Sequence, residues 1–171
     1  GAMICPDGPV ALDLEQFDQI LLAAHGFFLP SYYSILASHD ILDLAPAGHD
    51  NLLSWAMLQD AMRTRVQVSI KKIQSFYRPD SRFTIIQMPF PAEQAVTVLP
   101  DIARASAQPD LARIIATFNE IVSQSLRSAG LNHVQTPSHL LATPMLTRAC
   151  YARATTLPQG TTPGPSDYTH M

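Results

Sequence analysis

The strongest periodic pattern in this sequence runs from Asp50 to Arg78 and reads DNLLSWAMLQDAMRTRVQVSIKKIQSFYR. At 100° per residue, its large apolar side chains gather on one face of a helix. Asp50 is a suitable N-cap, and Pro79 marks the end because proline disfavours helical backbone in the residue before it. We therefore predict one long helix over this stretch.

The first half of the same stretch carries a second apolar strip on the opposite side of the predicted helix. Its members are Leu53, Met57, Ala61 and Val68. A helix that is apolar on two sides is usually buried on both. We therefore expect this helix to lie at the centre of a bundle.

Helical periodicity recurs on both sides of the long helix, and it predicts the fold class. The helical ranges are 13–25, 31–38, 109–129 and 138–154. Prolines interrupt the segment between Pro79 and Pro109. Its only convincing strand pattern, Phe83 to Met88, has no neighbouring segment with which it could pair. We predict an all-α fold: a helical bundle of about five to seven helices with a proline-broken, partly extended middle segment.

The two ends of the chain differ in character from its middle. Residues 1–9 read as a cloning scar, Gly1-Ala2-Met3, followed by a lead-in. Residues 10–154 read as a single helical domain, and residues 155–171 as a flexible tail or linker because they lack apolar periodicity. This organisation is typical of a domain taken from a larger protein.

Composition sets limits on the class of function. Charged residues reach only 15% of the chain, against about 25% in a typical soluble domain. Such a chain either covers its surface with neutral polar side chains or hides part of that surface against a partner. The net charge of −3 gives no general attraction to nucleic acid, and no apolar run is long enough to span a membrane. Two isolated cysteines, Cys5 and Cys150, favour a cytoplasmic or otherwise intracellular setting.

Catalytic motifs are missing from the sequence. It contains no glycine-rich phosphate loop, no Gly-x-Ser-x-Gly elbow, no Cys-x-x-Cys and no His-Glu-x-x-His. The remaining pattern is a pair of His-Asp dipeptides, His39-Asp40 and His49-Asp50, which would suit a metal-dependent hydrolase. The competing interpretation is that the aspartates cap turns and the histidines are loop residues. We predict no catalytic residues, no metal and no cofactor.

A basic band lies within the long helical stretch. Its members are Arg63, Arg65, Lys71, Lys72 and Arg78. On a helical wheel these cations spread around the polar arc instead of forming one row, which disfavours nucleic acid. The band is either a solvated face or a contact for an acidic partner protein.

These observations favour a non-catalytic protein-interaction or regulatory domain that acts through an apolar helical surface. The candidate binding residues are Trp55, Met62, Phe83, Ile85 and Phe118. The partner would be another protein or a second copy of the chain, in a closed dimer formed helix face on helix face or edge on edge through Phe83 to Met88. The alternative is a ligand-sensing helical domain with an apolar pocket near Trp55, Met62 and Phe118.

Overall fold

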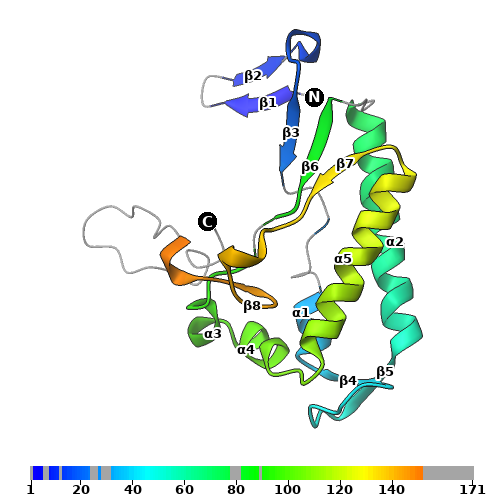
Figure 1. Ribbon diagram of the computed structural model, residues 1–171, viewed down its shortest axis with the longest axis vertical. Helices are drawn as coiled ribbons and strands as arrows, with labels where there is room; N and C mark the ends of the chain where they lie inside the picture. Colours follow the sequence, from blue (N-terminus) through cyan, green and yellow to red (C-terminus); the bar gives the residue numbers. More distant parts are fainter. Residues whose placement is uncertain are drawn as a thin grey trace.

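The computed structural model describes residues 2–5, 8–11, 13–23, 27, 32–77, 82–88 and 90–151, and the structural statements below concern these residues (Figure 1). The α-helices are α1 (Tyr33–Leu36), α2 (Trp55–Tyr77), α3 (Ala95–Val98), α4 (Pro100–Ser106) and α5 (Leu111–Ser128). The strands are β1 (Ala2–Cys5), β2 (Gly8–Ala11), β3 (Ile20–Ala23), β4 (His39–Leu42), β5 (Asn51–Ser54), β6 (Phe83–Ile86), β7 (Asn132–Val134), β8 (Leu141–Thr143) and β9 (Leu146–Thr147). Single 3-10 turns are η1 (Leu14–Gln16), η3 (Ser138–Leu140) and η4 (Ala149–Tyr151).

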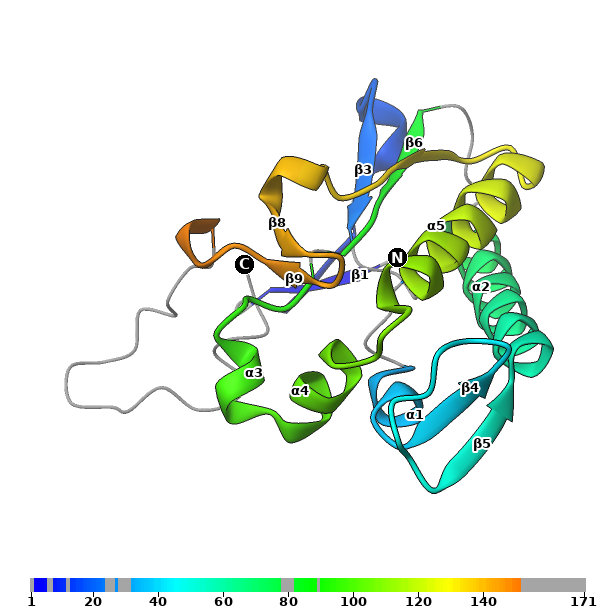
Figure 2. The same cartoon turned by 60° about the horizontal axis from the view of Figure 1, so that its bottom comes forward.

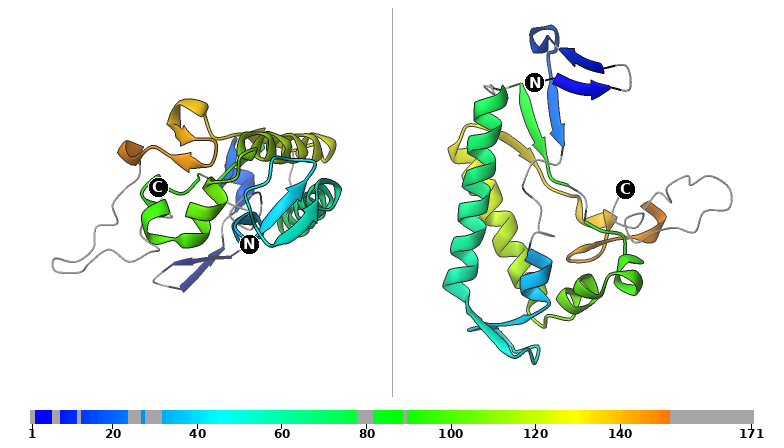
Figure 3. Two further views of the ribbon diagram at one scale, coloured as in Figure 1. Left: turned by 90° about the horizontal axis from the view of Figure 1, so that it is seen from below. Right: turned by 180° about the vertical axis from the view of Figure 1, so that it is seen from behind.

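A three-stranded parallel sheet organises the molecule. Its strand order is β3-β6-β7. The connection from β3 to β6 contains α2, and the connection from β6 to β7 contains α5. Both helices lie on the same face of the sheet (Figures 1 and 3), as right-handed crossovers between consecutive neighbouring strands require. The fold is therefore mixed α/β, and the predicted all-α bundle is wrong.

The first error lies in the stretch 13–25. Asp13 does cap a helical turn, because its Oδ1 accepts a hydrogen bond from the Glu15 N–H at 3.1 Å, but that turn is η1 alone. The chain then enters β3, where Ile20 and Leu22 are half-buried and the residues after each are exposed. A short apolar run has no reliable period, and the partner of Ile20 is Phe83, far along the chain.

The second error concerns Phe83 to Met88. We predicted an unpaired strand, but Phe83–Ile86 is β6, the central strand of the sheet, and it is paired on both sides. Its partners, β3 and β7, lie in stretches that carry no clear strand signal. This segment therefore offers no free edge for pairing with a second copy.

The helix predicted over 138–154 is also absent from residues 138–151, and residues 152–154 lie outside the described residues. The chain instead forms η3, a short antiparallel pair β8-β9 with Pro144 in the turn, and η4. Thr147 is fully buried in β9, where its N–H donates to the Pro91 carbonyl at 2.8 Å and its hydroxyl donates to the Phe90 carbonyl at 2.7 Å. These bonds to a distant segment replace the local bonds of a helix.

The long helix is confirmed as α2, with a later start than we predicted. Residues 51–54 form β5, which pairs in parallel with β4. Consequently Ser54 is the residue that caps the helix: its hydroxyl accepts a hydrogen bond from the Met57 N–H at 3.1 Å. Figure 2 shows the β4-β5 pair at the end of the molecule where α2 begins.

The helix predicted over 109–129 is confirmed as α5, and Gly130 ends it as expected. Gly130 has φ +71°, its N–H donates to the Arg127 carbonyl at 3.0 Å, and the Leu131 N–H donates to the Leu126 carbonyl at 2.9 Å. This is a Schellman motif, completed by burial of both leucines.

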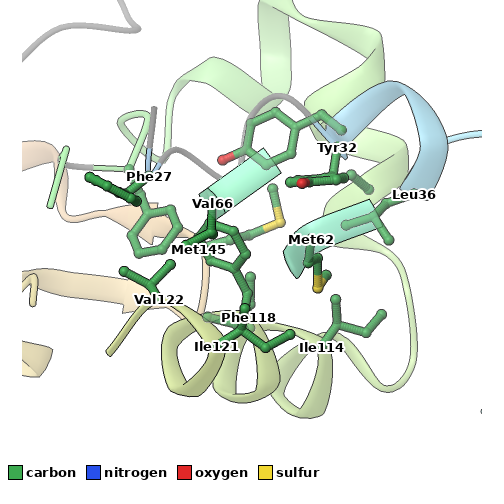
Figure 4. Packing of buried hydrophobic residues seen from close by; sticks show 14 of the residues in the cluster. Phe27, Tyr32, Leu36, Met62, Val66, Ile114, Phe118, Ile121, Val122 and Met145 are labelled. Atoms are coloured by element: carbon green, nitrogen blue, oxygen red, sulfur yellow. The ribbon is translucent and has the colours of Figure 1, made fainter. Parts of the chain in front are cut away.

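The hydrophobic core gathers around α2 and α5, where Tyr32, Leu36 and Met145 from other segments pack against the two helices (Figure 4). Ile85 of β6 belongs to the same cluster. Met62 and Phe118 are fully buried, and the Tyr32 ring meets the Phe118 ring edge-on at a centroid distance of 6.0 Å. The predicted burial of Met62, Ile70, Phe118 and Ile121 is confirmed. Trp55 is only half-buried.

The two faces of the parallel sheet differ strongly in burial. Phe83 and Ile85 point toward α2 and α5 and are buried. On the other face, Leu21 is 65% exposed and Val134 is 49% exposed. We call this other side the open sheet face, and its residues are Leu21, Ala23, Thr84, Ile86, Asn132 and Val134. A parallel sheet usually carries a layer on both faces, so this exposure is unusual.

Candidate functional site

The predicted binding residues are mostly part of the core. Met62, Phe83, Ile85 and Phe118 are buried and pack inside the chain. Trp55 is partly exposed, and the Arg113 guanidinium lies 5.6 Å from the centre of its ring, in a cation–π contact. Four of the five predicted binding residues therefore belong to the interior packing of the chain.

The outer face of α2 is exposed where we expected burial. Met57 is 63% exposed, Val68 is 55% exposed, and Ala61 between them is exposed too. These residues lie within 40° of one another on the helix at 100° per residue. Leu53, the fourth member of the predicted strip, lies in β5 and is half-buried against the core. For Met57, Ala61 and Val68 the expectation that α2 is covered on both sides is wrong, because their side chains are exposed. We call the strip, with Thr64 and Arg65, the outer face of α2.

A pocket of about 510 Å³ opens on this face. Its lining residues are Tyr32, Ala61, Thr64, Arg65 and Val68. Tyr32 closes the floor, because its hydroxyl donates a hydrogen bond to the Ala61 carbonyl at 3.2 Å. Burial raises the pKa of Tyr32 to about 12, and the nearby Arg65 charge opposes part of that rise. The tyrosine is therefore a neutral structural element, and the charge of the pocket comes from Arg65.

The basic band surrounds the outer face on two sides. Arg63, Arg65, Lys71 and Lys72 are all exposed. Arg65 and Lys72 lie on one flank of the apolar strip and Lys71 on the other, by their positions on the helix. Arg78 lies outside the described residues, as does the predicted tail, 155–171. The surface is therefore apolar along its middle and cationic along its borders.

Asp40 of the first His-Asp pair has a structural role beside the second pair. The Asp40 carboxylate accepts hydrogen bonds from the backbone N–H groups of Ala47, Gly48 and His49, at 2.8 to 3.2 Å. Desolvation raises the pKa of this carboxyl, but the three hydrogen bonds outweigh it and hold the pKa below its ordinary value. Within the described part of the chain, no three His, Cys, Asp or Glu residues are placed to hold a metal ion.

A polar cluster that the sequence did not suggest lies at the carboxyl ends of β6 and β7. Gln87 is buried, donates from Nε2 to the Asn119 Oδ1 at 2.9 Å, and accepts from the Thr136 N–H at 3.2 Å. Ligands of parallel sheets usually bind at this edge. The signal in the sequence was weak, because a glutamine after an apolar run is common.

Beside this cluster, Ser123 on α5 faces His133 on β7. The serine Oγ lies 3.4 Å from His133 Nδ1 and accepts a hydrogen bond from Gln135 Nε2 at 2.8 Å. Burial lowers the pKa of His133, so the ring is neutral at pH 7, and its Nε2 has no partner among the described residues. A serine–histidine catalytic pair needs a group that orients the imidazole through its other nitrogen, and no described residue is hydrogen-bonded to His133 Nε2.

A second, polar pocket of about 220 Å³ adjoins this pair. Its lining residues are Ser123, Arg127, Leu131, Asn132 and His133. It lies at the carboxyl end of α5, where the helix dipole disfavours anions. Neither nucleophilic catalysis nor phosphate binding is supported there.

The described helices include none with the length and hydropathy that crossing a bilayer requires. The chain matches no protein-family model, and comparisons with curated proteins and with solved structures found no match.

Proposed function

We propose that this chain is a non-catalytic protein-interaction domain that binds its partner through the outer face of α2. One observation supports this above all: the apolar strip Met57, Ala61 and Val68 is exposed on a long, well-packed helix. Because the strip lies on a rigid helix, its backbone loses little conformational entropy when a partner covers it. A regulatory role follows if the partner's activity depends on that contact.

The chemistry of the outer face defines the partner. An apolar middle calls for an apolar surface opposite, and the borders at Arg65, Lys71 and Lys72 call for carboxylates around it. The partner is another protein or a second copy of the chain. Nucleic acid is a poorer fit, because phosphates would face Met57 and Val68 as well as the cations.

A ligand-sensing role is the second candidate, and the pocket beside Tyr32 bears on it. Its volume of about 510 Å³ falls within the range of ligand sites. However, the pocket is a shallow depression in the outer face of α2, and its lining includes none of Trp55, Met62 and Phe118, where we expected a cavity. A small molecule there would keep much of its surface in water, whereas a protein segment would cover the pocket and the strip together.

We also propose an intracellular site of action. The exposed thiol of Cys150 is unpaired, and a reducing compartment preserves such a group.

Site-specific photo-crosslinking in the source cells tests the proposed function. A photoreactive residue at position 68 should yield one dominant adduct, since Val68 lies at the centre of the outer face. The matched control places the same group at Gln74, which is exposed on another side of α2. Adduct formation at position 68 should fall when Arg65 is changed to Glu, because the partner's border is acidic. Equal adduct patterns at positions 68 and 74 would contradict the proposal.

A further inference from the structure

The open sheet face lacks a covering layer within the described residues. Helices normally cover both faces of a parallel sheet, because crossover connections place them there. Here α2 and α5 both cover the face that buries Phe83 and Ile85. The opposite face presents Leu21 and Val134, each about half exposed or more, beside Ala23 and Ile86. The centre of the open sheet face is therefore suited to packing against the apolar strip of a helix.

The amino end of the open sheet face has an acidic border. Three exposed carboxylates precede β3: Asp13, Glu15 and Asp18. Arg82 fixes this turn beside the start of β6, because its Nη1 donates to the carbonyls of Leu14 at 3.2 Å and Phe17 at 3.1 Å. The carboxylates are thus held at one end of the sheet.

The outer face of α2 has the complementary pattern. It is an apolar strip on a helix, and its cations lie in the half that ends at Tyr77. Within one copy, α2 runs antiparallel to β3, β6 and β7, so its basic half lies at the same end of the molecule as the acidic residues before β3 (Figure 1). A helix from another copy, lying antiparallel on the open sheet face, would set its basic half against Asp13, Glu15 and Asp18.

We propose that the chain self-associates by packing the outer face of α2 of one copy onto the open sheet face of the next. This inference rests on the proposed function and names its partner as a second copy. The two surfaces are different, so the contact is heterologous and leaves one of each surface free on every pair. The assembly therefore grows beyond a dimer, into a ring where the rotation between copies closes and into a filament where it does not. It differs in this from the closed two-fold dimer expected from the sequence.

The size of the contact predicts its strength. Two strands of four residues and one of three, spaced about 4.8 Å apart, give a footprint of about 170 Å². A stable interface buries about 800 Å² on each partner. The association is therefore weak and reversible, and added salt weakens it further because it screens the acidic and basic borders.

Sedimentation velocity over a concentration series tests the proposal with two variants, Val68→Lys on the helix and Val134→Lys on the sheet. Both side chains are exposed, and circular dichroism with thermal unfolding should show that each variant folds like the parent. The parent should grow beyond a dimer as concentration rises, and each variant alone should stay monomeric. An equimolar mixture of the variants should form dimers and nothing larger, because only one intact pair of surfaces remains.

The outcomes separate this inference from the proposed function. A parent that is monomeric at every concentration overturns the self-association, as does a single variant that still associates or a mixture that does not. A crosslink from position 68 to a different protein would support the proposed function. It would contradict the inference that the partner is a second copy of the chain. Gln74→Lys places the same charge at an exposed position of α2 outside its outer face and is the control. This control should associate like the parent, and its failure to do so would also count against the assigned surfaces.

Discussion

At the scale of single residues, Phe118 supports the contact between α5, α2 and the segment at Tyr32. It is fully buried and meets the Tyr32 ring edge-on. We expect Phe118→Ala to lower the free energy of unfolding by about 3–5 kcal/mol, because it removes a large apolar group and leaves a cavity. Urea denaturation measures the loss, and Gln124→Ala on the exposed side of α5 is the control. Equal stabilities of parent and Phe118→Ala would show that the ring is not core.

Asp40 contributes stability that depends on pH. Because its pKa is depressed in the folded state, the contribution is fully present above the pKa of the unfolded chain and disappears as pH falls through the folded-state pKa. Asp40→Asn removes the charge but keeps a similar shape. We expect this variant to be less stable than the parent at neutral pH, with the difference shrinking below about pH 4.

Urea unfolding of Asp40→Asn and of the parent, at neutral pH and below about pH 4, measures how the difference in stability changes with pH. Asp60→Asn, a change of equal charge at an exposed position of α2, is the control. A stability gap that stays constant with pH would mean that the charge of Asp40 does not hold the loop from Ala47 to His49.

At the scale of secondary-structure elements, the end of α5 depends on the backbone of Gly130. Its φ of +71° is accessible to glycine and strained for alanine. No heavy atom lies within 4 Å of a Cβ built there, so the cost of Gly130→Ala is conformational and not steric crowding. We expect a loss of about 1–2 kcal/mol by chemical denaturation. Gly130→Asn should cost less, because asparagine tolerates this conformation better, and the reverse ranking would contradict the argument.

At the scale of the whole molecule, the sheet joins segments that are distant in sequence. The central strand β6 is bonded on both sides, whereas β3 and β7 each have one neighbour in the described sheet. We expect the amides of Thr84 to Ile86 to exchange with solvent most slowly of the three strands, since their exposure requires opening both pairings. Hydrogen exchange followed by mass spectrometry measures this. Faster exchange in β6 than in β7 would contradict the strand order.

The sequence by itself determined the two long helices. Local signals were sufficient because a helix satisfies its backbone within the segment: the apolar stripe through Met62 and Ile70 predicted α2, and Gly130 marked the end of α5. The burial of Phe118 followed from the same period. The sequence identified the strip of Met57, Ala61 and Val68 as apolar, but we assigned this strip to the interior of the protein.

The tertiary structure alone decided the fold class and the exposure of that strip. A parallel strand takes its hydrogen-bond partners from distant segments, so the stretches containing β3 and β7 carried no local sign that β6 would lie between them. Whether an apolar strip is core or surface likewise depends on what packs against it. Once the sheet set α2 beside α5, one stripe of the helix was buried and the other stayed exposed.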